Sequence, residues 1–201
     1  MSAENKPLYP WVIVDGVDYS GKSTLSRELA ITLGGITVRS IPLELTTVRQ
    51  LVEQYCDVDS RYNFFIASAF FTYHRLQGIL LKQGPVVVDR WMYSTNIHHK
   101  LLGLQEEKLL PPELIPRSKF MYFTSVSYKS WLKRKIARNE HGVDDDFIDD
   151  RFIREMNTYL KDHGLIEINT DQMTPQESVN FIMRYIIQEN NFQGGSILTN
   201  C

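Results

Sequence analysis

Short runs of apolar residues alternate along the chain with stretches in which apolar side chains recur every three or four positions. The apolar runs predict strands at residues 11–15, 36–40, 86–89, 119–124 and 165–168. The periodic stretches predict helices at residues 22–33, 44–55, 61–83, 92–103, 127–141, 148–162 and 175–189. Strands that alternate with helices predict an α/β domain, in which a five-stranded parallel sheet carries helices on both faces.

The helix expected at 61–83 is unusually apolar. It contains Phe64, Phe65, Ile66, Phe70 and Phe71 within eight positions. A helix that is apolar around most of its circumference is normally buried on more than one side. We therefore expect it to pack in the interior of the domain.

Length and composition indicate one globular unit. The chain has 201 residues, 43% of them hydrophobic and 23% charged, which suits a single domain at residues 1–189 followed by a flexible polar tail at 190–201. A net charge of -2 provides no basic field for nucleic acid or an anionic membrane surface.

The cysteine content and the hydropathy of the chain are used to predict its cellular location. The two cysteines do not form a disulfide framework. No stretch approaches the roughly 18 apolar residues of a membrane span, and residues 1–7 lack the apolar core of a signal peptide. A cytoplasmic location is therefore expected.

The first predicted strand runs into a glycine-rich motif. Gly16 and Gly21 enclose four residues, and Lys22 and Ser23 follow directly. This is the spacing of a phosphate-binding loop, where backbone amides and a helix N-terminus surround phosphate oxygens, and where the lysine and serine reach the terminal phosphates and Mg²⁺. We expect the whole loop to bind ATP: Gly16, Val17, Asp18, Tyr19, Ser20, Gly21, Lys22, Ser23 and Thr24.

Further charged residues follow other strands. Asp89 and Arg90 close the third strand, and Arg39 closes the second. In a parallel sheet these carboxyl ends lie at the edge that holds the ligand. Asp89 is expected to hold Mg²⁺ with Ser23, directly or through water, and the two arginines are expected to bind a second phosphate, with Lys22, Asp89 and Arg90 in catalytic roles.

A basic helix followed by an acidic run predicts a lid at about 129–147. Arg134 and Arg138 are expected near the phosphates as catalytic groups that stabilise transferred charge. Lys135 is expected to face solvent. Residues 144–146 are expected to be a solvated helix start, or alternatively to hold the lid open by pairing with its basic residues.

Two predictions concern the acceptor molecule. Asp18 is not required for phosphate binding, so its carboxylate is a candidate contact to an acceptor sugar hydroxyl. Phe70, Phe71 and Arg75 are candidates for contact with a nucleobase, which needs a stacking partner and a polar group at its edge. An ordinary core role remains the alternative for this aromatic stripe.

These motifs together resemble the thymidylate kinase family. Residues 15–24, the Arg39-Ser-Ile-Pro42 segment and Asp89-Arg-Trp-Met-Tyr-Ser94 occur in that family's order and spacing. The resemblance implies ATP as donor, a nucleoside 5′-monophosphate as acceptor, and commonly a homodimer. It also implies Arg39 and Arg90 on the acceptor phosphate and Asp18 on the acceptor sugar.

The chain departs from that family at two places. The family's Ser-Ala-Asn-Arg segment, whose arginine reads thymine, is replaced by Ser68-Ala69-Phe70-Phe71, which leaves the base of the acceptor open. Tyr19 occupies the loop position where some members carry a catalytic arginine, so Arg134 or Arg138 is expected to supply it from the lid.

The sequence thus predicts transfer of the ATP γ-phosphoryl group to a (deoxy)nucleoside monophosphate. A deoxynucleoside kinase is the first alternative, and Glu44 would be its carboxylate base after the second strand. A nucleotide-binding protein without turnover is the second alternative.

Overall fold

The computed structural model describes residues 9–139 and 142–192 and contains the predicted parallel sheet. Its strand order is β2-β3-β1-β4-β5, with every neighbouring pair parallel. The strands are β1 (Trp11–Asp15), β2 (Ile36–Arg39), β3 (Val86–Asp89), β4 (Phe120–Ser125) and β5 (Ile166–Asn169). Each lies within a residue or two of its predicted position, so the expected α/β fold class is confirmed.

The helices also follow the apolar periodicity. They are α1 (Lys22–Thr32), α2 (Thr46–Tyr55), α3 (Val58–Gly78), α4 (Met92–Leu101), α5 (Tyr128–Arg138), α6 (Asp150–Asp162) and α7 (Pro175–Phe192). α3 begins before the predicted residue 61 because the Asp57 side chain caps it, accepting from the Ser60 amide at 2.8 Å.

The C-terminal boundary differs from the prediction. α7 continues to Phe192, three residues beyond the predicted helix end at residue 189, and the flexible tail stays a prediction. The remainder of that predicted tail lies outside the described residues.

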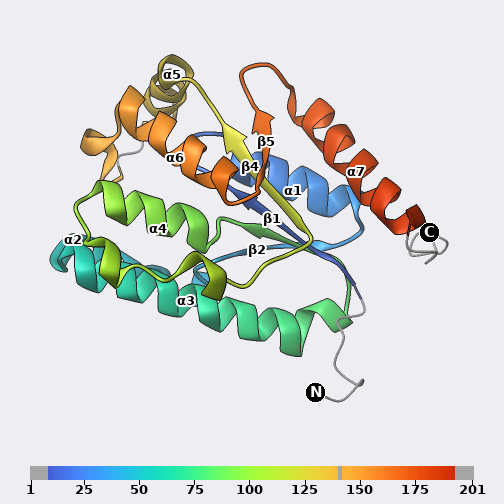
Figure 1. The fold of residues 1–201 in the computed structure, drawn as a ribbon, viewed down its shortest axis with the longest axis horizontal. Coiled ribbons are helices and arrows are strands. Elements are labelled where there is room, and N and C mark those ends of the chain that lie inside the picture. Colours follow the sequence, from blue (N-terminus) through green and yellow to red (C-terminus); the bar gives the residue numbers. More distant parts are fainter. Residues whose placement is uncertain (1–8, 140–141, 193–201) are drawn as a thin grey trace.

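The two faces of the sheet carry different helices (Figure 1). Val12 and Val14 of β1 pack with Leu25 and Leu29 of α1 and with residues of α7. Ile13 faces the opposite layer, which α3, α4 and α6 form. Successive side chains of a strand point to opposite faces, so β1, buried throughout, reads as an uninterrupted apolar run.

α3 is buried on one side only. Tyr62, Phe65, Ala69 and Leu76 form its buried face, whereas Phe71 is 54% exposed. The expectation that this helix is covered on more than one side is therefore wrong in the described structure. The predicted homodimer stays a prediction.

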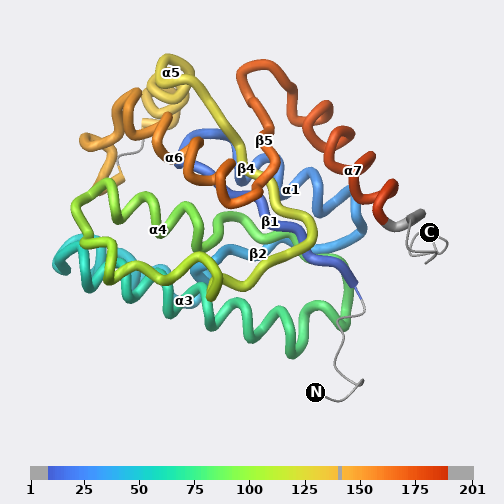
Figure 2. The backbone as a smooth tube through the Cα atoms, in the orientation of Figure 1, coloured from blue at the N-terminus to red at the C-terminus, as the bar shows by residue number. Residues whose placement is uncertain are grey.

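The topology gathers several segments at the carboxyl edge of the sheet. The chain leaves β1 towards β2 on one side and later passes to β4 on the other, and such a switch point opens a crevice beyond the strand ends. Figure 2 shows α2, α4 and residues 142–149, which precede α6, at the same side of the molecule. None of the helices in the described ranges is long and apolar enough to span a membrane.

Candidate functional site

A cavity of about 520 Å³ opens at this edge of the sheet. One part of its wall, here called the phosphate-loop end, contains residues that the sequence singled out. The structure brings these together from four stretches of sequence: Asp18, Tyr19, Gly21, Lys22, Ser23, Arg39, Asp89, Arg90 and Arg138. The remaining predicted loop residues, Gly16, Val17, Ser20 and Thr24, do not line it.

The loop conformation depends on glycine at two positions. Gly16 has φ +126°, and a Cβ there would lie 2.6 Å from the Thr124 carbonyl oxygen, a contact that the β4 backbone cannot relieve. Gly21 has φ +100° and immediately precedes α1. Both requirements are met at low cost only by a residue without a side chain.

Val17 and Ser20 hold the loop together rather than facing the cavity. The buried Ser20 hydroxyl donates to the Val17 carbonyl at 2.6 Å and contacts the Thr124 hydroxyl at 2.5 Å. The loop is thereby tied to β4, the neighbouring strand.

Lys22 is buried at the first turn of α1 and points back into the loop. Its Nζ donates to the Val17 carbonyl at 2.8 Å and lies 3.2 Å from Asp18 Oδ1. Burial lowers the pKa of Lys22, while the charge of Asp18 opposes that shift. The ammonium group is thus positioned where an anion in the loop would meet it.

Asp18 and Arg90 form an ion pair across the mouth of the loop. Arg90 adopts φ +76°, an uncommon conformation for a residue with a side chain, and its amide is held by the Val14 carbonyl at 2.9 Å. Burial acts to raise the pKa of Asp18, but Arg90 and then Lys22 hold it well below its usual range. Asp18 therefore remains a carboxylate.

Asp15 is a site residue to which the sequence assigned no role. Its buried carboxylate accepts from the amides of Gly16 at 3.0 Å, Trp91 at 3.1 Å and Ser94 at 3.0 Å. Burial raises the pKa of Asp15, and these hydrogen bonds oppose that rise. The residue joins the phosphate loop to the start of α4, so it fixes the loop relative to Arg90.

Ser23 and Asp89 are the oxygen donors that could hold a metal ion. Both line the same cavity, and Asp89 is a nearly buried carboxylate. Oxygen donors of this kind suit Mg²⁺, which takes one or two protein ligands together with phosphates and water. In the described ranges no cluster of three or more His, Cys, Asp or Glu side chains offers a cage for an ion.

The predicted arginines occupy three different settings. Arg39 is exposed at the cavity edge of β2, opposite Asp89 in the register of the sheet. Arg138 lines the cavity, with its guanidinium carbon 5.7 Å from the centre of the Tyr19 ring. Arg134 does not line it; its guanidinium donates to the Thr170 hydroxyl at 2.8 Å and carbonyl at 2.9 Å, and lies 3.5 Å from the Tyr19 carbonyl oxygen of the loop.

The acidic run beyond α5 is only partly solvated, since Asp146 is exposed but Asp145 is not. Asp145 is buried and lies 3.4 Å from Lys135 Nζ, 3.3 Å from the Tyr19 hydroxyl and 2.8 Å from the Gly142 amide. The first expectation is wrong for this residue. The expected pairing with a basic residue of α5 is present, and its effect on a lid stays a prediction. The prediction that Lys135 faces solvent is also wrong.

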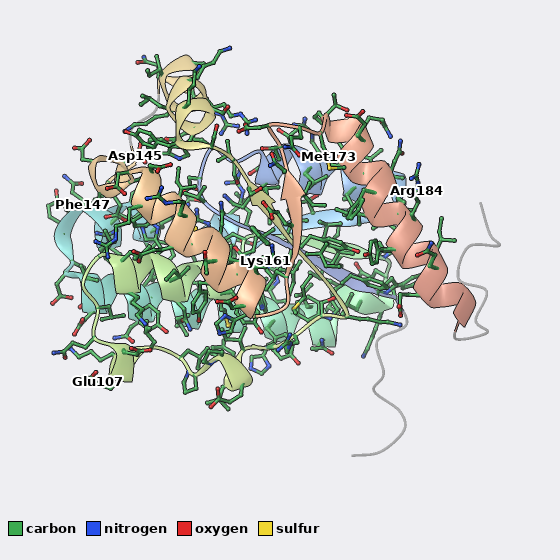
Figure 3. All side chains as sticks on the ribbon, turned by 45° about the horizontal axis from the view of Figure 1, so that its top comes forward. Glu107, Asp145, Phe147, Lys161, Met173 and Arg184 are labelled. Carbon is green, nitrogen blue, oxygen red and sulfur yellow. The ribbon has the colours of Figure 1, made fainter. Side chains whose placement is uncertain are left out.

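Asp144 reaches in the other direction, away from the lid helix. It accepts from His98 Nε2 at 3.0 Å and from the nearly buried guanidinium of Arg61 on α3. Burial acts to raise the pKa of Asp144, but these hydrogen bonds lower it to about 2. Figure 3 places Asp145 and Phe147 on this turn beside α5, and Phe147 is 66% exposed.

The far part of the cavity is formed by helices and was missed by sequence reasoning. We call it the helical end; it comprises Arg49 and Glu53 of α2, Phe65 of α3, and Thr95, His98 and His99 of α4. A usable signal was the spacing of Phe65, Ala69, Thr72 and Leu76, which marks the face of α3 directed at the sheet.

Phe70, Phe71 and Arg75 do not line the cavity. Phe70 packs against the core, and Phe71 is exposed beneath the Arg75 guanidinium. Arg75 also pairs with Glu44 at 3.4 Å. The predicted contact of one of these three with a base is not supported by this arrangement, in which α3 presents Phe65 instead.

Several solved structures share the fold. A thymidylate kinase from Candida albicans superposes with a TM-score of 0.66 at 16% identity, over 90% of this chain and 92% of that one. A deoxyadenosine kinase from M. mycoides gives 0.66 at 13% identity, over 89% and 99%. A thymidylate kinase from Ehrlichia chaffeensis gives 0.58 at 21% identity, over 91% and 99%.

No protein-family model and no curated protein matches the sequence. At these identities the structural likeness concerns the fold. The chain has the P-loop fold of thymidylate kinases and deoxyadenosine kinase.

Proposed function

We propose that the protein transfers the γ-phosphoryl group of ATP to a (deoxy)nucleoside 5′-monophosphate. The observation that carries this proposal is a single cavity that joins the phosphate loop, the cations Arg39 and Arg90, and an end with the aromatic side chain of Phe65. Phosphoryl transfer needs two phosphates held in line, with their charge neutralised. The cavity offers one binding region for each phosphate and a third for a base.

The donor phosphates are assigned to the loop and to Lys22. The backbone of residues 16–22 and the N-terminus of α1 provide amide donors and a favourable dipole. Ser23 and Asp89 would hold Mg²⁺, which supplies charge neutralisation and orientation of the phosphates. Lys22 would exchange its bonds to Val17 and Asp18 for phosphate oxygens.

The acceptor is assigned to Arg39, Arg90 and Asp18. Guanidinium groups bind phosphate through paired hydrogen bonds, and the carboxylate of Asp18 is suited to accept from a sugar hydroxyl. Arg138 is the lid residue assigned to the transferred group, because it lines the cavity. Arg134 is assigned to holding the Thr170 segment, since its guanidinium is bonded there.

A deoxynucleoside kinase is the second candidate, favoured by the equal TM-score of the deoxyadenosine kinase. Its reaction requires a carboxylate near the acceptor hydroxyl. Glu44, the residue expected in that role, lies outside the cavity and pairs with Arg75. Glu53 lines the cavity and would replace it.

A coupled assay of ADP release tests both candidates. ATP·Mg²⁺ is supplied with each common nucleoside and each 5′-monophosphate, and the product is identified by mass. Turnover with monophosphates alone supports the first proposal, and turnover with nucleosides alone supports the second. ATP binding without transfer to any acceptor would overturn both and leave a nucleotide-binding protein.

A further inference from the structure

The helical end contains a buried imidazole with one unsatisfied nitrogen. His99 is 3% exposed and lines the cavity. Its Nδ1 lies 2.9 Å from the Thr95 carbonyl oxygen. Within the described ranges its Nε2 is buried and has no hydrogen-bond partner. Buried polar atoms are nearly always paired, so this nitrogen is suited to a ligand.

The hydrogen bond to Thr95 determines what that nitrogen can do. A carbonyl oxygen only accepts, so Nδ1 must carry the proton that it donates. Burial, with the neighbouring His98, lowers the pKa of His99 to about 4. The ring is therefore neutral near pH 7, and Nε2 presents a lone pair. His99 can accept a hydrogen bond there and cannot donate one.

The Thr95 hydroxyl, like His99 Nε2, can only accept a hydrogen bond from a ligand. Its hydroxyl donates its only proton to the Trp91 carbonyl at 3.3 Å, so the oxygen has only acceptor capacity left for the cavity. The Arg49 and His98 side chains, which line this end, are engaged elsewhere: Arg49 donates to Glu53 at 2.8 Å, and His98 contacts Asp144 at 3.0 Å. The wall around His99 thus offers acceptors.

Aromatic rings flank this acceptor. The Phe65 and Tyr62 rings lie 5.5 and 5.4 Å from the His99 ring, centre to centre. The Tyr62 hydroxyl is already bonded to Asn96 at 2.8 Å and to the Leu110 amide at 2.5 Å. Phe65 lines the cavity, so it can contact the face of a planar ring while His99 meets its edge.

We propose that the helical end selects a nucleobase with an exocyclic amino group, a 4-aminopyrimidine or a 6-aminopurine, through acceptance by His99 Nε2 and Thr95 Oγ1. An amino group carries two protons and can donate to both atoms. A 4-oxo or 6-oxo base would direct a carbonyl oxygen at the same lone pairs, leaving them unpaired. This inference rests on the proposed function in placing a base at the helical end.

The test is equilibrium binding, measured by calorimetry on the full chain without ATP. The ligand pairs are dCMP against dUMP and dAMP against dIMP, whose bases differ only in the amino or oxo group and the adjacent ring nitrogen's proton. For at least one pair we expect the amino member to bind about 10- to 100-fold more tightly, the effect of one satisfied or lost buried hydrogen bond.

Three variants sharpen this test. His99→Phe keeps a flat ring without the acceptor and should bring the affinity ratio close to one. His99→Gln offers a carbonyl oxygen at a similar reach and should retain most of the preference. His74→Phe makes the same change at an exposed histidine of α3 outside the cavity and should leave the ratio unchanged.

Equal affinities within both pairs, tighter binding of the oxo members, or no binding of any of the four would overturn the inference. If His99→Phe does not fold, the wild-type ratios and His99→Gln still decide it. Selective binding without phosphoryl transfer would refute only the proposed function. Transfer without base selectivity would refute only this inference.

Discussion

The two ends of the cavity are built in opposite ways. At the phosphate-loop end, charged groups dominate, and most come from three short stretches of sequence around Lys22, Arg39 and Asp89. At the helical end, the Arg49–Glu53 ion pair lies with the Phe65 ring and the buried imidazole of His99, and all of these come from helices that the sheet brings together. Phosphate is the same in every nucleotide and is bound by local backbone and charge. A base must be distinguished by shape and proton positions, which require packed side chains.

The largest effect is expected at the charged end. Lys22→Met should lower kcat by about 10³-fold, because a single preorganised group at the transferred charge contributes about that much, while thermal stability changes little. The coupled ADP assay measures it. Lys161→Met, at an exposed position of α6, is the matched control. Equal activity of the two variants would contradict the role of Lys22.

Asp144→Asn tests whether the Asp144 carboxylate stabilises the helices at the helical end through Arg61 and His98. It leaves the nearly buried guanidinium of Arg61 without its carboxylate partner, which should reduce the free energy of unfolding by about 3 kcal/mol. Urea denaturation measures this. Asp146→Asn, on the exposed side of the same turn, should change stability far less, and similar losses in both variants would refute the assignment.

Substitution of Arg138 and substitution of Arg134 should change different kinetic constants. Arg138→Ala should reduce kcat by about 10²-fold, because this side chain lines the cavity. Arg134→Ala should act mainly on stability and on KM for ATP, since it releases Thr170. Steady-state kinetics of both variants distinguish the roles. A larger loss of kcat in Arg134→Ala would reverse them.

Acid should destabilise the helical end through His99. Its pKa is lowered from 6.5 to about 4 in the folded protein, so below pH 6.5 the unfolded chain binds a proton that the folded protein excludes. The contribution of neutral His99 to the free energy of unfolding is fully present above pH 6.5. Between pH 6.5 and pH 5 the free energy of unfolding should fall by about 2 kcal/mol. Denaturation as a function of pH measures the slope. His99→Phe should flatten it over this window, and an unchanged slope would contradict the assignment.

The smallest effect is expected from the aromatic contact. Phe65→Leu should raise KM for the acceptor about tenfold with little change in kcat, because stacking on a base contributes about 1–3 kcal/mol. Phe71→Leu, at the exposed side of α3, is the control. If Phe71→Leu has the larger effect on KM, a base contact at the outer face of α3 regains support.

The sequence alone determined the elements and the phosphate-loop end. Glycine spacing, a lysine at a helix start and charged residues directly after apolar strands are local features, and a parallel sheet must bring its carboxyl ends to one edge. Hence these local features suffice to place Lys22, Asp89, Arg90 and Arg39 together at that edge. Their roles in catalysis stay predictions.

Only the tertiary structure decided the helical end and the contacts of the acidic run that follows α5. Whether Phe65 or Phe71 faces the cavity depends on the rotation of α3 against the sheet, which near-uniform apolarity of that helix conceals. Whether Asp144 is solvated depends on Arg61 and His98, which lie 83 and 46 residues away in the chain. Long-range contacts of this kind leave no local pattern, because the partner that satisfies each group is known only once the helices are packed.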